Sequence, residues 1–349
     1  MSRTSRALAA VSLGAAASLA VTAAPAGAAA RFTPGAPGAG DPYFPDMGNG
    51  GYDVAHYDIG LTYDPGTKGI QAVAKIKARA TQNLSRFDLD FLGPLKISSL
   101  RVDGRAASYT RTGAQELVVT PRKGLRKHRT FTVTVAYSGV PQTINDATLG
   151  TSGWVPTPDG AVMLNQPFGA ATVFPVNDHP TDKATYTFTL SAPRNLTTLS
   201  NGDLRGRWTK GGWTTTRWEV RNPMASELSM LAIGKYDVLT GRTKAGIPNL
   251  TATDLAMAIK PDDAKKFHQQ TAEVTDFQNG LYGRYPFTST GGIVVKGGRR
   301  LRAGDAGPPR VRSRAPGPAA SRARASSPTS WVTSGSATRS PRPGGRTSG

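Results

Sequence analysis

Residues 55–63 read AHYDIGLTY, and residues 70–79 read IQAVAKIKAR. In both stretches apolar and polar side chains alternate, which is typical of β-strands that bury one face. The residues expected on the buried face of the first strand are Ala55, Tyr57, Ile59, Leu61 and Tyr63, with His56, Asp58 and Thr62 on the other face. Those expected on the buried face of the second are Ile70, Ala72, Ala74, Ile76 and Ala78.

The same alternation continues toward the C-terminus. An Asp103-Gly104 pair between residues 97–102 and 105–110 predicts a hairpin with a tight turn, and residues 210–212, KGG, predict another turn. Further strands are expected at residues 116–120, 131–137, 185–191, 213–220 and 228–237. Short strands without a long helical period predict a mainly β, antiparallel domain that extends to about residue 240.

The pattern changes after Gly246. One more strand is expected at residues 250–259, and Pro261 is suited to the first position of a helix that ends near residues 280–283. The apolar stripe expected to bury this helix consists of Phe267, Val274, Phe277 and Leu281. Because residues 291–295 are again apolar, residues 241–295 are expected to begin a second, α/β domain and to stop before it closes a core.

Composition excludes several classes of site. The chain has 349 residues and no Cys, so disulfides, Cys-ligated zinc and thiol nucleophiles are excluded. Its four His residues are too far apart in sequence to form a local metal-binding pair. Of the formal net charge of +20, residues 296–349 carry most, with twelve Lys and Arg and one acid. The rest is mildly basic, which does not indicate nucleic-acid binding.

The two ends of the chain differ from its middle. Arg3 and Arg6, an Ala- and Leu-rich run, and small residues at 26–28 predict a secretory signal peptide over residues 1–28. A Gly- and Pro-rich linker is expected at residues 29–47. We therefore expect an extracellular protein with no membrane attachment after cleavage. Residues 296–349 predict a disordered tail, either an unselected segment, which we favour, or a basic arm for nucleic acid or anionic surfaces.

Several phrases together resemble one enzyme family. Residues 164–167 read LNQP, residues 174–180 FPVNDHP, residues 182–188 DKATYTF, residues 199–202 LSNG and residues 282–287 YGRYPF. Their order and spacing over residues 48–295 resemble the N-terminal part of the zinc aminopeptidases of the aminopeptidase N and leukotriene hydrolase family. The Ala-, Gly- and Arg-rich signal is similar to that of exported actinobacterial members.

The resemblance implies an architecture and an activity. Residues 48–240 would form a saddle-like β domain, and residues 241–295 the truncated start of a thermolysin-like catalytic domain. The intact enzyme would hydrolyse N-terminal residues from peptides with a free N-terminus, using water activated by Zn²⁺. This chain contains no zinc ligands and no catalytic residues of the family, so we expect the chain as written to be an inactive N-terminal fragment.

We interpret the missing motifs as displaced out of frame. Residues 329–341, back-translated with suitable synonymous codons and read one base earlier, give His-Glu-Leu-Gly-His-Gln-Trp-Phe-Gly-Asp, which contains the zinc motif His-Glu-x-x-His. Residues 301–309, read two bases earlier, give Gly-Tyr-Ala-Leu-Glu-Thr-Gln, similar to the amine-binding segment of the family. Residues 296–349 are therefore interpreted as frame-shifted.

The resemblance assigns one substrate-binding residue, Gln166. An amide oxygen there could accept a hydrogen bond from the substrate ammonium group; the alternative is a polar residue at a strand end. Asp178 and Lys183 are expected to be structural, and His179 is not expected to bind metal.

Two alternative functions remain. A secreted, non-enzymatic β-rich binding protein is the first, and a surface- or nucleic-acid-binding protein that uses the tail is the second. Trp208, Trp213 and Trp218 could form a platform for carbohydrate, although ordinary packing in the sheet is the favoured interpretation.

Overall fold

The structure is a computed structural model that describes residues 31–296 and the backbone of residues 331–332. The expected signal peptide at 1–28 and nearly all of the expected tail at 296–349 lie outside the described residues. The described chain is mainly β, as the sequence predicts. It contains one long helix, α1 (Pro261–Tyr282), and no helix among the described residues is long and apolar enough to cross a membrane.

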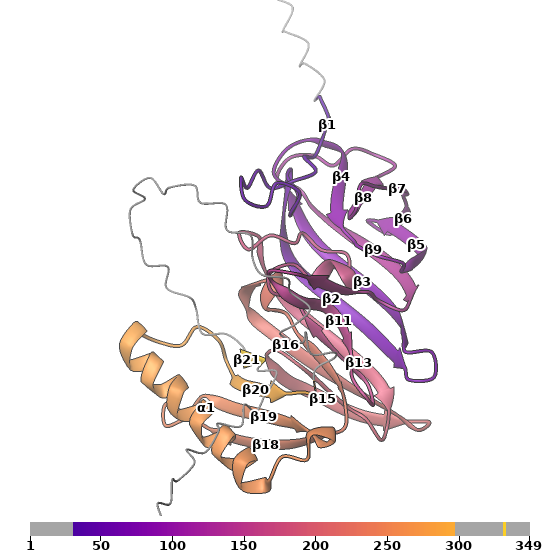
Figure 1. The fold of residues 1–349 in the computed structure, drawn as a ribbon. Coiled ribbons are helices and arrows are strands. Elements are labelled where there is room, and N and C mark those ends of the chain that lie inside the picture. Colours follow the sequence, from indigo (N-terminus) through magenta and orange to yellow (C-terminus); the bar gives the residue numbers. More distant parts are fainter. Residues whose placement is uncertain (1–30, 297–330, 333–349) are drawn as a thin grey trace, which may run out of the picture. The chain divides into compact units, whose positions relative to one another are not determined.

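The largest sheet has eight strands in the order β15-β16-β13-β2-β3-β9-β5-β6 (Figure 1). Its strands are β2 (Tyr52–Asp64), β3 (Gly69–Ala80), β5 (Lys96–Val102), β6 (Arg105–Ala106), β9 (Thr130–Gly139), β13 (Lys183–Pro193), β15 (Asp203–Lys210) and β16 (Trp213–Ala225). The alternation predicted for β3 is confirmed, because Ile70, Ala72, Ala74, Ile76 and Ala78 are all buried.

Two smaller sheets are formed by the same part of the chain. One has the order β1-β4-β8-β7, and the other has the order β10-β11-β12-β17-β14. The strands of the first are β1 (Thr33–Pro34), β4 (Leu84–Asp90), β7 (Ser108–Thr112) and β8 (Glu116–Thr120). Those of the second are β10 (Thr143–Asp146), β11 (Gly150–Pro156), β12 (Ala161–Leu164), β14 (Thr197–Ser200) and β17 (Leu231–Gly234).

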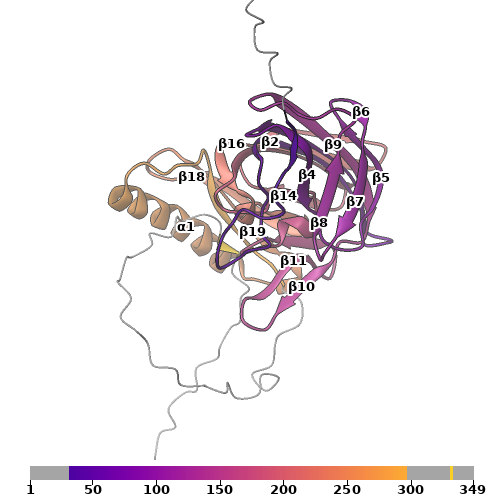
Figure 2. The same ribbon diagram turned by 90° about the horizontal axis from the view of Figure 1, so that it is seen from above.

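Aromatic side chains fill the space between these sheets. Seen from above, β4, β7 and β8 lie against the end of the large sheet that contains β5 and β9 (Figure 2). Phe87 of β4 and Phe131 of β9 meet there, with ring centroids 5.2 Å apart. On the inner face of the large sheet, Tyr57 and Tyr186 stack at 5.1 Å. Burying aromatic side chains of this size contributes much of the stability of a β core.

The sheets are not wholly antiparallel. β13 pairs with β2 in parallel, with Thr185 beside His56 and Ser191 beside Thr62, and β1 pairs with β4 in parallel. A period-two pattern reports which face is buried but not strand direction, so the sequence did not reveal these parallel pairs. The remaining neighbours in the large sheet are antiparallel.

The buried face predicted for the first strand is wrong at one end. The register of β2 against β3 shifts between Val54 and His56, so Ala55 is exposed and Val54 is buried. A bulge adds one residue to a strand and reverses the alternation on one side of it. From Tyr57 to Tyr63 the predicted face is correct.

One expected hairpin and one expected strand are divided differently in the structure. Asp103 and Gly104 both have positive φ, which agrees with the predicted tight turn, but β6 ends at Ala106 and the chain then joins another sheet as β7. Residues 228–237 do not form one strand. They contain the end of a 3-10 turn (η2, Ser226–Leu228), then β17, and then the start of β18 (Tyr236–Arg242).

A four-stranded sheet in the order β18-β19-β20-β21 follows, with α1 lying along it (Figure 1). The strand expected at residues 250–259 is shorter, because β19 (Pro248–Asp254) gives way to a 3-10 turn (η3, Leu255–Met257). β20 (Thr290–Val294) pairs in parallel with β19 and with β21 (Trp331–Val332).

The helix begins at Pro261 as predicted, but the face that was predicted to be buried is mostly exposed. Val274, Phe277 and Leu281 are exposed, with Phe277 at 67%, and Phe267 is only half-buried. The helix contacts the sheet through small and polar residues instead. Thr275 bonds Thr290 at 2.9 Å, and Asn249 donates to the His268 carbonyl at 2.9 Å. Helical spacing predicted the helix, but the stripe that it predicted to be buried is not the face that meets the sheet.

Candidate functional site

Gln166 lies two residues after β12, with an exposed side chain. Within residues 31–296 its amide makes no hydrogen bond, and the Gln166–Pro167 peptide bond is cis. The neighbouring Asn165 is buried and donates to the Ser229 carbonyl at 2.7 Å and to the Ser226 carbonyl at 3.3 Å. The strand end is therefore fixed to the 226–229 turn, while the Gln166 amide can receive a ligand.

Asp178 contacts the 226–229 turn from the interior of the protein. It is 2% exposed, and its carboxylate accepts hydrogen bonds from the Ser226 hydroxyl at 2.6 Å and from the Ala171 N–H at 3.4 Å. Burial raises the pKa of Asp178 to about 6, although the bond from Ser226 opposes the rise. The carboxylate is thus internal and joins two loops, which is a structural role.

Asp90 of β4 is a second internal carboxylate. One oxygen accepts from the Asp178 N–H at 2.7 Å and the Asn49 amide at 3.1 Å, and the other accepts from the Gln115 amide at 2.9 Å. Burial, with the nearby charge of Asp178, raises the pKa of Asp90 well above its ordinary value. The segment after Phe174-Pro175 is therefore tied to β4 by side-chain bonds.

The same segment is also tied to the start of β2. The Asn177 N–H donates to the Tyr57 hydroxyl at 2.9 Å, and the Asn177 amide donates to Asp182. The Asp182 carboxylate accepts from the Val54 N–H at 3.2 Å, and burial raises its pKa to about 7. Residues 174–182, which contain the most specific motif of the sequence, therefore link β4 to the start of β2. Their buried polar groups are used in hydrogen bonds within the protein.

Lys183 and His179 take no part in a ligand site here. Lys183 begins β13 with its side chain exposed, and it forms no ion pair within residues 31–296. His179 is buried, with Nδ1 at 2.7 Å from the Thr181 hydroxyl and Nε2 at 3.2 Å from Asp41. Both ring nitrogens have partners, so neither is directed toward an open metal position.

The chain's histidines do not fit a zinc site. His56 lies 2.7 Å from the Thr185 hydroxyl, His128 lies 3.4 Å from Arg79, and His268 lies 2.8 Å from the Thr251 hydroxyl. Across the part of the chain that the structure describes, no three His, Asp or Glu side chains are grouped as metal ligands. Zinc in proteins requires three or four such ligands, and the residues present do not provide them.

The two remaining segments that resemble the family, residues 199–202 and 282–287, lie close together in the structure. Asn201 accepts from the Met230 N–H at 2.6 Å and donates to the Leu228 carbonyl at 3.0 Å, so it holds the 226–230 loop. The Ser289 hydroxyl, just after Tyr285-Pro286-Phe287, donates to the Gly202 carbonyl at 2.9 Å. A cavity of about 580 Å³ lies between these segments, and its lining includes Leu199, Trp218, Met224, Tyr285 and Phe287.

The buried carboxylates were not found from the sequence. Asp88 and Asp90 interrupt the apolar run that contains Phe87, Leu89 and Phe91, which was the available signal. All five of these residues are buried. Acidic residues that face inward from a strand require hydrogen-bond partners, and the sequence does not show which distant segments supply them.

Comparisons with known proteins agree with this architecture. Residues 54–228 match the family model described as the Peptidase M1 N-terminal domain. The chain is 32% identical over 98 residues to aminopeptidase N of Haemonchus contortus, covering 26% of this chain and 10% of that protein. It is 31% identical over 89 residues to glutamyl aminopeptidase of Sus scrofa, covering 25% of this chain and 9% of that protein.

Solved structures extend the similarity beyond the matched domain. The M1 zinc metallopeptidase from Deinococcus radiodurans aligns with a TM-score of 0.67 at 26% identity, over 76% of this chain and 60% of that one. A mutant of it bound to a Tyr-Ser-Ala substrate aligns with a TM-score of 0.66 at 26% identity, over 76% of this chain and 61% of that one. The chain thus spans less than two thirds of these relatives.

Proposed function

Because the chain belongs to the peptidase M1 family through its N-terminal domain, we propose that it represents a zinc-dependent aminopeptidase that removes N-terminal residues from peptides. The match over residues 54–228 carries the proposal. The structural similarity to an M1 zinc metallopeptidase bound to a Tyr-Ser-Ala substrate supports it, as do the aminopeptidase names of both curated relatives.

Gln166 is the residue of this chain that we assign to the substrate. Its exposed amide follows a strand end that Asn165 fixes to the neighbouring turn. An amide oxygen accepts hydrogen bonds, and the free amine of a peptide is an ammonium group with several N–H donors at neutral pH. The described part of the chain would therefore bind and orient the peptide N-terminus, and Asp178 and Asp182 would hold the supporting loops.

Hydrolysis itself would require residues that this chain does not provide. Zn²⁺ would activate water in the intact enzyme. All four histidines lie within the described residues and are separated there, and residues 297–349 contain no His. We propose that the 349-residue chain as written does not hydrolyse peptides. Zinc-dependent release of an N-terminal amino acid by this purified chain would contradict that proposal.

We attribute the missing motifs to an interrupted reading frame. The out-of-frame amine-binding motif in residues 301–309 and the out-of-frame zinc motif in residues 329–341 occur in the same order as in the family. The two motifs require different reading frames. The decisive experiment is to resequence the coding DNA from the Tyr285 codon to a few hundred bases beyond the stop. A corrected frame that runs through both motifs is expected, whereas confirmation of the present frame would make this a decayed or truncated copy.

The restored enzyme then tests the substrate role. Gln166→Ala should raise KM for an aminoacyl anilide about tenfold or more, because a hydrogen bond to a charged group is lost. Gln71→Ala, on the exposed face of β3, is the matched control and should leave KM unchanged. An unchanged KM for Gln166→Ala would remove the assignment.

We also propose that the enzyme is exported and cleaved after Ala28. N-terminal sequencing of the protein recovered from culture medium should begin at Ala29. Recovery of the uncleaved chain only from cells would refute export.

A further inference from the structure

The hairpin of β15 and β16 exposes two indole rings on the outer face of the large sheet. Trp208 is 49% exposed and Trp213 is 38% exposed, whereas Trp218 is buried. Of the three tryptophans considered as a platform, the structure thus leaves two available. The cross-strand partner of Trp208 is Thr215, two residues from Trp213, so the two tryptophans are diagonal neighbours at roughly 7 Å.

The ring of Trp208 lies along the strand that carries it. A methyl group added at Gly206 would lie 3.3 Å from Cζ3 and 3.7 Å from Cε3 of the indole. The absence of a side chain at Gly206 therefore leaves room for the ring beside this position, where Trp208 remains 49% exposed. Trp213 is paired with Lys210 on one side and with Pro193 on the other. The hairpin thus presents two apolar ring surfaces on one face of the sheet.

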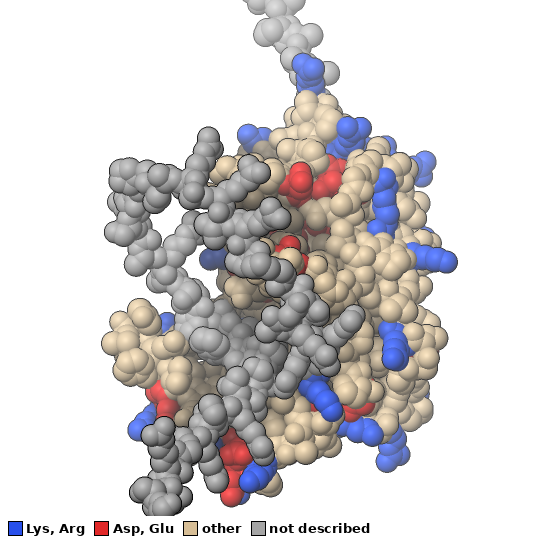
Figure 3. Space-filling view, in the orientation of Figure 1, with Lys and Arg blue, Asp and Glu red and all other residues tan. Residues whose placement is uncertain are grey.

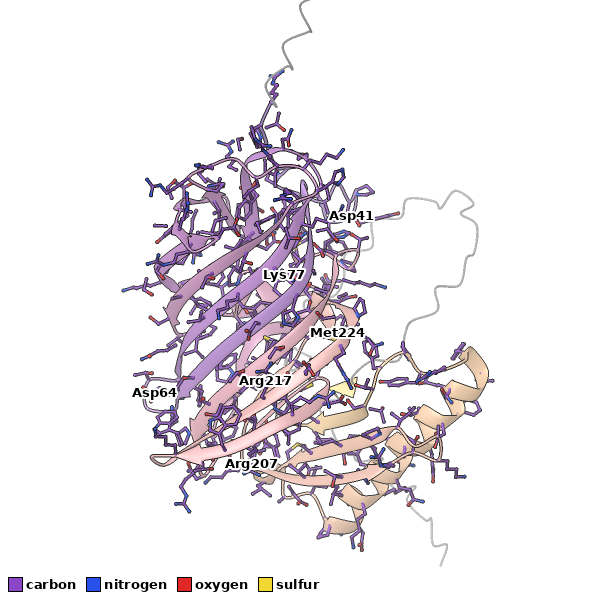
Figure 4. The ribbon with its side chains drawn as sticks, turned by 180° about the vertical axis from the view of Figure 1, so that it is seen from behind. Asp41, Asp64, Lys77, Arg207, Arg217 and Met224 are labelled. Carbon is purple, nitrogen blue, oxygen red and sulfur yellow. The ribbon has the colours of Figure 1, made fainter. Side chains whose placement is uncertain are left out.

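Positive charge accompanies these rings. Lys210 is paired with Trp213, and Arg217 is paired with Gly206. Neither cation forms an ion pair with another described residue, and both are exposed. Figure 4 looks onto this face, with Arg217 on β16 and Lys77 further along on β3.

Of the other arginines on β15 and β16, Arg205 and Arg221 form ion pairs, whereas the exposed Arg207 forms none with another described residue. Arg205 bonds Asp203 at 2.8 Å and Glu219 at 3.0 Å, and Arg221 bonds Asp203 at 3.2 Å. On the opposite view, Lys and Arg side chains are spread over the visible surface and do not form one patch (Figure 3). Free charge combined with flat aromatic surface is therefore a feature of the hairpin patch, which we define as Trp208, Lys210, Trp213 and Arg217.

Hydroxyl groups continue the patch across the sheet. Thr215 bonds the Ser191 hydroxyl at 2.7 Å, and Ser191 is in register with Thr62 on β2. These side chains are short, so the surface beside the rings is shallow and polar.

We propose that the hairpin patch binds an acidic polysaccharide. The C–H faces of sugar rings would stack on the exposed indoles, whose π surfaces are partly negative. Arg217 and Lys210 would pair with carboxylate or sulfate groups of the sugar chain. A membrane-binding role would favour indoles that project away from the sheet, whereas Trp208 lies along its own strand. This site is separate from Gln166, and the inference does not rest on the proposed peptidase function.

Polygalacturonate is a suitable probe, and its methyl ester is the uncharged comparison. Binding is measured by titration calorimetry on the full chain at about 0.15 M salt, where long-range attraction is screened. Every variant keeps the basic residues 297–349, so differences between variants report the patch. Trp208→Ala with Trp213→Ala should weaken binding about tenfold, and Arg217→Gln should weaken binding to the acid but not to the ester.

Two controls are matched to these changes. Tyr282→Ala removes an exposed aromatic ring from α1, and Lys266→Gln removes an exposed cation from the same helix. Neither should change binding. Equal losses in the controls and the patch variants, or no loss in the tryptophan variant, would overturn the proposal. If the patch variants lost binding to phosphatidylglycerol vesicles but still bound polygalacturonate like the parent chain, the patch would be assigned to a membrane. That result would also overturn the proposal. Arg217→Gln leaves both rings in place and therefore tests the patch if the tryptophan variant folds poorly.

Discussion

The buried carboxyl of Asp178 gives a quantitative prediction about pH. Its pKa is raised from 3.8 to about 6 because burial disfavours the charged form. Between these values the folded chain holds this proton more tightly than the unfolded chain. The stability that this proton contributes is therefore fully present below about pH 4 and is lost as the pH rises through 6. A displacement of roughly two pKa units corresponds to a loss of about 3 kcal/mol.

Asp178→Asn isolates this effect. The amide oxygen can still accept the Ser226 hydroxyl bond, which is 2.6 Å long in the parent chain, but the side chain no longer titrates. Urea unfolding, followed by tryptophan fluorescence at several pH values from 4 to 7.5, gives the free energy of unfolding. We expect the fall in this free energy over that range to be smaller in the variant by about 3 kcal/mol. Asp182, with a pKa of about 7, should sustain a remaining fall in both proteins.

Two further variants make the test specific. Asp262→Asn changes an exposed carboxylate at the start of α1 and should leave the pH profile unchanged. Ser226→Ala removes a bond that favours the charged form of Asp178, so it should steepen the loss of stability with pH. Parallel profiles for the parent chain and Asp178→Asn would refute the reasoning.

Three other predictions concern loops and surface. Asn201→Ala removes both bonds to the 226–230 loop and should lower the free energy of unfolding by about 2 kcal/mol, measured by urea unfolding. Gly202→Ala should cost more than Gly104→Ala in the same assay: both have positive φ, but only at 202 would a methyl group overlap a backbone carbonyl. Phe277→Glu should reduce aggregation, measured by light scattering, without lowering the unfolding midpoint, because this side chain is exposed. Equal costs at the two glycines, an unaffected Asn201 variant or a destabilised Phe277 variant would each contradict the structure.

Local patterns predicted most strands because each alternation records one buried face. All five residues predicted to be buried in β3 are buried, and Pro261 marked the start of α1. Local patterns could not show the bulge at Ala55, the parallel pairing of β13 or the face of α1 that meets the sheet. Those features depend on partners elsewhere in the chain.

The candidate site divides in the same way. The motif around Asn177 could be recognised in the sequence. Its structural role, however, depends on hydrogen bonds with Asn49 and Tyr57, which lie more than one hundred residues earlier. Gln166 was named from the resemblance, and the structure adds that its side chain is exposed and that Asn165 anchors its strand end. Neither the sequence nor the structure identifies a zinc site, because the required ligands are not grouped within residues 31–296.

The parallel pair of β2 and β13 has a consequence for how the chain folds. β3 follows β2 directly and can cover one of its edges as a local hairpin, but the other edge pairs with residues about 130 positions later, such as Thr185 beside His56. Contacts of such long sequence separation slow folding, because a large loop must close first. During synthesis, the thirteen-residue β2 therefore keeps an open edge until β13 is available, and chaperone protection in that interval would prevent it from pairing with a second chain.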